Sequence, residues 1–75
     1  MKITLNPYGN GWCDLVIGLK RAEIDELIRS LHMLKSVPDH FHGHATFKGD
    51  GGVADIEFSV IPDDAQDNTR LDSMG

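Results

Sequence analysis

The sequence has little that would tie it to a membrane or to an oxidising compartment. Its 75 residues include a single cysteine, Cys13, which excludes a disulfide within the chain. It has no apolar run of about 20 residues, so we expect no transmembrane helix. The opening residues, MKITLNP, turn polar too early for a signal peptide. These features predict a cytoplasmic protein with no membrane partner.

Positive charge is also scarce. Seven Lys and Arg residues stand against twelve Asp and Glu residues, and the formal net charge is −5. Proteins that bind nucleic acid usually carry a cluster of basic side chains, because neutralising phosphates supplies much of their affinity. We therefore expect no nucleic-acid partner, and an acidic surface favours a basic protein partner instead.

The first half of the chain predicts a hairpin followed by a helix. Apolar and polar residues alternate over residues 2–6 and 12–19, and an NPYGNG turn separates the two segments. The spacing of the apolar residues then changes. Over residues 20–36 they recur at helical intervals and form one stripe, which predicts a helix. Lys20 stands where a helix usually has a capping Ser or Thr, and Pro38 ends the helix.

The second half predicts another hairpin. Residues 40–48, HFHGHATFK, and residues 53–60, VADIEFSV, alternate as half-buried strands do, and we expect 49–52 to form the loop. The predicted pairs are Phe47–Ala54, Ala45–Ile56, Gly43–Phe58 and Phe41–Val60 on an apolar face, and Thr46–Asp55, His44–Glu57 and His42–Ser59 on a polar face. A slip of one residue would mix the two faces, so the pattern specifies which side chains point inward.

Together these elements predict an α+β fold, a two-layer sandwich in the order β-β-α-β-β, with antiparallel hairpins and the helix packed on one sheet face. We expect the odd-numbered face of the first hairpin to lie under the helix, with Cys13 among its apolar residues. Residues 1–60 would form the single domain, and residues 61–75 an acidic, mobile tail. A chain this short has a thin core, so we expect a homo-oligomer, with a dimer favoured.

The opposite, open face of the sheet is the candidate recognition surface. Its predicted partner-binding residues are His40, His42, His44, Trp12, Asp14, Asp55 and Glu57. An exposed tryptophan often anchors an interface, although Trp12 could equally fold onto Tyr8.

The same face admits two further interpretations. His42, His44 and Glu57 could hold one zinc ion, because side chains two apart on a strand point the same way. We favour ordinary cross-strand polar pairs over metal, and expect no cofactor. Cys13 and a histidine could form a nucleophile and its base, but Cys13 falls on the opposite face, so we predict no catalytic residues and no enzyme activity.

Three segments within residues 15–60 carry a family resemblance: RAEIDELIRSLHMLK, PDHFHGHATF and GGVADIEFSV. Their combination resembles a family of small bacterial immunity proteins found beside polymorphic toxins. The resemblance implies inhibition of a cognate toxin by direct binding, and the acidic balance would suit a basic toxin. The alternative is a small oligomeric protein that sequesters a ligand or metal, such as a phage counter-defence protein that binds a nucleotide.

Overall fold

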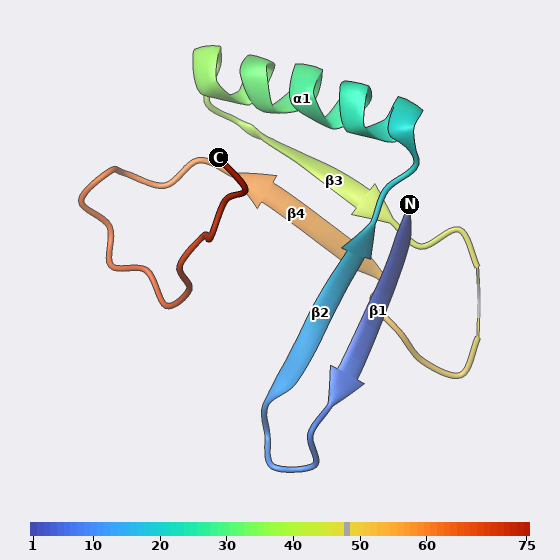
Figure 1. Cartoon of the computed structure of the whole chain (residues 1–75). Coiled ribbons are helices and arrows are strands. Elements are labelled where there is room, and N and C mark those ends of the chain that lie inside the picture. The colour runs from blue at the N-terminus through green and yellow to red at the C-terminus, as the bar shows by residue number, and fades with distance from the viewer. Residues whose placement is uncertain (48) are drawn as a thin grey trace.

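The computed structural model describes residues 1–47 and 49–75, and it shows two antiparallel hairpins joined by one helix (Figure 1). The elements are β1 (Lys2–Pro7), β2 (Cys13–Gly18), α1 (Arg21–Ser36), β3 (His40–His44) and β4 (Asp55–Ser59). This confirms the predicted α+β class and the order β-β-α-β-β. Within the described residues, α1 is neither long enough nor apolar enough to cross a membrane.

The first hairpin pairs β1 with β2 in the order expected from the alternation. Ile3 lies opposite Ile17, and Leu5 lies opposite Leu15, so one face of the hairpin is apolar. The turn between the strands uses Gly9 and a second glycine two residues later, both with positive φ, a conformation that side chains rarely tolerate. The sequence predicted all four strand ends of this hairpin to within one residue.

Helix α1 begins without a capping side chain at Lys20, because an ammonium group can only donate hydrogen bonds. Glu23 compensates by accepting a hydrogen bond from the backbone N–H of Lys20 at 3.0 Å. The amino group of Met1 donates to the other carboxylate oxygen of Glu23 at 2.6 Å. That bond, followed by the bond from Lys20, lowers the pKa of Glu23. The start of the helix is therefore fixed by one carboxylate.

The second hairpin has the predicted sidedness but a different register. Both strands alternate between exposed and half-buried residues, with Phe41 and Phe58 on the half-buried side. The pairs are His40–Ser59, Phe41–Phe58, His42–Glu57, Gly43–Ile56 and His44–Asp55, and Ala45 N–H donates to Ala54 O at 2.9 Å. The predicted register was therefore wrong by two residues, and the connection spans 46–53 rather than 49–52. Residues 45–47, which were predicted to continue the strand, are not part of it, and Lys48 lies outside the described residues.

Aromatic packing accounts for the observed register. The rings of Phe41 and Phe58 stack with centroids 4.7 Å apart and an angle of 11° between their planes. The predicted register would have paired Phe41 with Val60 and separated the two rings. A shift of two residues leaves every side chain on the same face, so alternation cannot distinguish these registers. The pairing of one aromatic ring with another decides between them.

The helix covers the second hairpin and leaves the first one open. Figure 1 shows α1 running above β3, whereas the turn of the β1–β2 hairpin points away from the helix. The hairpins form two separate two-stranded sheets. Among the described residues, Leu34 is the single large apolar side chain that is buried. The expectation that the first hairpin packs under the helix was wrong, since Leu5 and Leu15 are 44% and 51% exposed.

Residues 61–75 contain no helix or strand, and all of them are described. The segment turns back on itself after Pro62, where Ala65 N–H donates to Pro62 O at 2.9 Å. An exposed contact joins Arg70 Nε to Asp72 Oδ1 at 3.2 Å. The segment therefore has local turns but adds no layer to the fold.

Candidate functional site

The second hairpin gathers three histidines and two carboxylates on one surface. His40, His42 and His44 project from the exposed side of β3, and Asp55 and Glu57 project from the same side of β4. We call this set of five residues the histidine face. Strand alternation places them together because side chains two apart on a strand share a face.

Carboxylates hold the histidine rings in defined orientations. His42 Nδ1 lies 2.9 Å from Asp55 Oδ2, and His44 Nδ1 lies 2.9 Å from Asp55 Oδ1. Asp39, just before β3, lies 2.9 Å from His40 Nδ1. An ionised carboxylate only accepts hydrogen bonds, so His42 Nδ1 is the donor in its hydrogen bond with Asp55.

The rings also pack against one another along β3. His40 and His42 make an edge-to-face contact with centroids 5.0 Å apart. His42 and His44 stack with centroids 5.4 Å apart and 12° between their planes. His42, in the middle, has the least exposed side chain of the three, at 28%. Exposed contacts of this kind contribute little to stability, so the network orients the rings more than it holds the fold together.

The cross-strand register determines which carboxylate each histidine meets. His42 Nε2 lies 3.8 Å from Glu57 Oε1, because His42 and not His44 is paired with Glu57. Among the described residues, His40, His42 and Glu57 form a set whose ligand atoms all lie within 4.8 Å of one another. The metal candidates named from the sequence were His42, His44 and Glu57. The two-residue shift in register places Glu57 opposite His42, so that His40 comes within reach, while His44 contacts Asp55 instead.

Trp12 and Asp14, the other two predicted partner-binding residues, lie on the first hairpin and apart from the histidine face. Trp12 comes just before β2 and is 74% exposed. Its backbone N–H donates to Asn10 Oδ1 at 3.1 Å. The β1–β2 turn that carries it projects away from the second hairpin (Figure 1). The structure therefore divides the predicted surface into two parts.

Asp14 is engaged within its own hairpin. Tyr8 donates its hydroxyl hydrogen bond to Asp14 Oδ1, and this bond, with desolvation as the next cause, raises the pKa of Tyr8. Tyr8 N–H also donates to Trp12 O at 2.9 Å. These contacts order the turn that presents Trp12.

Cys13 does not occupy the covered position expected for it. It is exposed, and it pairs with Pro7 at the turn end of the first hairpin. Cys13 lies on the odd-numbered face of the hairpin, as predicted, but the helix does not cover that face. The histidines lie on the other hairpin, so this structure does not place Cys13 beside a base.

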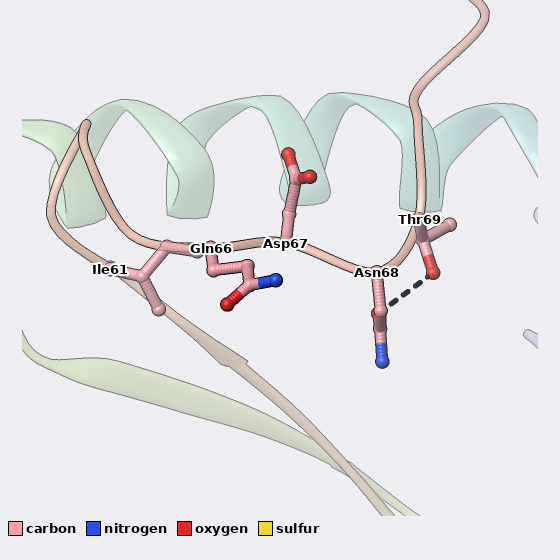
Figure 2. A pocket seen from close by; sticks show the side chains of 5 residues that line it. All are labelled: Ile61, Gln66, Asp67, Asn68 and Thr69. Atoms are coloured by element: carbon pink, nitrogen blue, oxygen red, sulfur yellow. Dashed lines mark hydrogen bonds between the residues drawn. The ribbon is translucent and has the colours of Figure 1, made fainter.

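The hollow shown in Figure 2 lies in residues 61–75 and is open to solvent. It is lined by Ile61, Gln66, Asp67, Asn68 and Thr69. The Asp67 carboxylate points to the opposite side from the amides of Gln66 and Asn68, and Thr69 Oγ1 donates to Asn68 Oδ1 at 3.0 Å (Figure 2). Polar groups that diverge in this way do not converge on a ligand.

Comparisons of the chain with models of protein families, with curated proteins and with solved structures found no match. Asp39, whose carboxylate contacts His40, is the residue beside the histidine face that the sequence reasoning did not name. Its position immediately before His40, in PDHFH, was the available signal.

Proposed function

We propose that this chain is a non-enzymatic binding protein of the cytoplasm. It inhibits a protein partner by direct contact. It also forms a homodimer, in which each copy covers apolar surface that the other leaves exposed. The observation that carries the proposal is the apolar surface that one chain leaves uncovered. Apolar faces that are left open to solvent are typical of sites of protein association.

The exposed area is far larger than a self-contained protein of this size would have. The chain exposes 7201 Å², whereas a folded monomer of 8.3 kDa exposes about 4,600 Å². Its radius of gyration is 14.3 Å, against about 11 Å expected for 75 residues. The excess of about 2,600 Å² exceeds the roughly 1,000–2,500 Å² that each subunit of an obligate homodimer buries, and the exposed segment 61–75 accounts for part of it.

Two apolar faces contribute to this excess. One is the odd-numbered face of the first hairpin, which carries Leu5 and Leu15, and the other is the α1 stripe, on which Ile24, Ile28 and Leu31 are 42%, 49% and 44% exposed. We propose that the first hairpin of one copy covers α1 of the other. The sandwich expected within one chain would then form between two chains, as in an exchange of equivalent elements.

The histidine face remains free in such a dimer and is the proposed surface for the inhibited partner. The net charge of −5 favours a basic partner and would accelerate association at low ionic strength. The resemblance of residues 15–60 to small immunity proteins supports a toxin as that partner.

Light scattering and native mass spectrometry test the dimer. We expect a particle of twice 8.3 kDa at micromolar concentration, and a melting temperature that rises with protein concentration, because the dimer is coupled to folding. A folded monomer whose melting temperature does not change over a hundredfold range of concentration would contradict it.

Co-expression tests the inhibited partner. The chain should protect cells from a toxin encoded beside its gene and should bind the purified toxin. Asp55→Asn with Glu57→Gln should slow association at low salt by about tenfold. The matched control, Asp63→Asn with Asp64→Asn in the tail, removes the same charge and should slow it by less than about twofold. Absence of binding contradicts inhibition, and equal slowing by both variants contradicts this surface.

A further inference from the structure

We propose that His40, His42 and Glu57 form a binding site for one divalent transition-metal ion with the ligand preference of Zn²⁺. This site does not depend on the proposed inhibitory function. It joins two neighbouring strands of one hairpin, and its three ligand atoms lie within 4.8 Å of one another. The remaining position of a tetrahedral shell would be taken by water.

The distances require only small side-chain movements. His42 Nε2 and Glu57 Oε1 are 3.8 Å apart. Ligand atoms of a tetrahedral zinc ion are separated by about 3.3 Å, so no pair of the three needs to approach by more than about 1.5 Å. The three side chains are partly exposed, and rotation about their side-chain bonds can supply that movement without moving the strands.

A second, independent observation is the pair of carboxylates behind the histidines. Asp55 accepts a hydrogen bond from His42 Nδ1 at 2.9 Å, and Asp39 Oδ1 lies 2.9 Å from His40 Nδ1 as a close polar contact. Histidines that ligate metals almost always donate their other ring N–H to a carboxylate, a carbonyl or water, which fixes the tautomer and makes the ligating nitrogen more basic. His42 already has this arrangement, and the Asp39 carboxylate lies close enough to His40 Nδ1 to supply it for His40 after a small rotation.

The supporting hairpin keeps the ligands in place. The stacked rings of Phe41 and Phe58 lie on the opposite face, next to His42 and Glu57 in the sequence. This contact fixes the register in which His42 is paired with Glu57. Ligands on paired strands are held more closely than ligands on loops.

The donor atoms select the class of ion. Two imidazole nitrogens and one carboxylate oxygen suit Zn²⁺, Co²⁺, Ni²⁺ and Cu²⁺, whereas Mg²⁺ and Ca²⁺ prefer oxygen ligands throughout. The carboxylates of Asp39 and Asp55 add negative charge around the ion. The site should therefore bind Zn²⁺ or Co²⁺ and discriminate against Mg²⁺.

His44 provides a matched control. It lies on the same strand and face, and its Nδ1 also contacts Asp55 at 2.9 Å. Its side chain is 72% exposed, and it is not part of the three-residue set. His32 on α1 is a second control, since it lies outside the hairpin altogether.

The experiment uses the full chain without an affinity tag, stripped of metal with a chelator and then dialysed. Calorimetry with Zn²⁺ should show one ion per chain with micromolar affinity, and Co²⁺ should give the visible absorption of a tetrahedral complex. His40→Ala, His42→Ala and Glu57→Gln should each weaken Zn²⁺ binding by more than about tenfold, and Asp39→Asn by about tenfold. His44→Ala and His32→Ala should change it by less than about twofold.

No heat at micromolar Zn²⁺ would overturn the proposal. So would a His40→Ala variant that keeps its affinity while His44→Ala loses it, because the ligands would then be those of the other register. Circular dichroism of each variant verifies the fold. If His42→Ala unfolds, His40→Ala and Glu57→Gln decide the matter, since those residues are more exposed.

Discussion

The two hairpins of this chain have the same plan and different surroundings. Each pairs two antiparallel strands with an apolar face and a polar face. In the second hairpin the apolar face is half-buried beneath α1, and in the first hairpin every residue of β2 is exposed. Alternation therefore determines which side chains share a face, but burial requires another layer. The chain supplies that layer for one hairpin only.

The largest expected effect is on the covered hairpin. Phe58→Ala removes the ring stacked on Phe41 and should lower the free energy of unfolding by about 2–3 kcal/mol. Urea denaturation followed by circular dichroism measures this. Phe47→Ala is the matched control, because Phe47 is 76% exposed and should change stability by less than about 0.5 kcal/mol. Equal losses in the two variants would remove the distinction between covered and uncovered aromatic residues.

The next effect tests whether a second copy covers the first hairpin. Leu15 and Val16 are neighbours on β2 with almost equal exposure, 51% and 49%, but they lie on opposite faces. Leu15→Asp should raise the dissociation constant of the dimer at least tenfold, about 1.4 kcal/mol, because it places a charge in the proposed contact. Val16→Asp should raise it by less than about threefold. Analytical ultracentrifugation measures both, and a dimer insensitive to Leu15→Asp would exclude this face.

The smallest effect tests whether the turn of the uncovered hairpin is ordered in solution. The hydrogen bond to Asp14 holds the pKa of Tyr8 above its ordinary value of 10.0. The bond favours the neutral phenol, so its contribution to stability is present below pH 10 and disappears as the pH rises through the raised pKa. Tyr8 is the single tyrosine, so ultraviolet absorbance reports its titration directly. Asp14→Asn should lower this pKa, and identical titrations would mean that the contact does not form.

Much of the second hairpin could be predicted from local pattern, and its register could not. The alternation of His42 with Phe41 indicated which side chains point outward, and the structure agrees. Registers two residues apart have identical sidedness, so the choice depends on the stacking of Phe41 with Phe58, which alternation does not describe. The proposed ligand set depends on the register, and this is why His40 was not named with the metal candidates.

The separation of Trp12 from the histidine face was beyond the sequence for a different reason. Trp12 with Asp14, and the histidine face, were each assigned to the polar face of their own hairpin. Neither assignment described how one hairpin lies relative to the other. The angle between the hairpins depends on contacts between distant segments, and α1 packs on β3 without drawing β1 and β2 beneath it. Periodicity specifies the faces of elements, and tertiary packing determines how those faces meet.

The division into two-stranded sheets has a consequence for hydrogen exchange. In an isolated antiparallel pair, alternate amides bond across to the neighbouring strand and the others point outward to solvent. Along β3 and β4, slow and fast exchange with deuterium should therefore alternate with a period of two residues. If two chains associate by joining strands side by side, the outward amides of one strand would also become protected. If they associate by covering an apolar face, the alternation would persist.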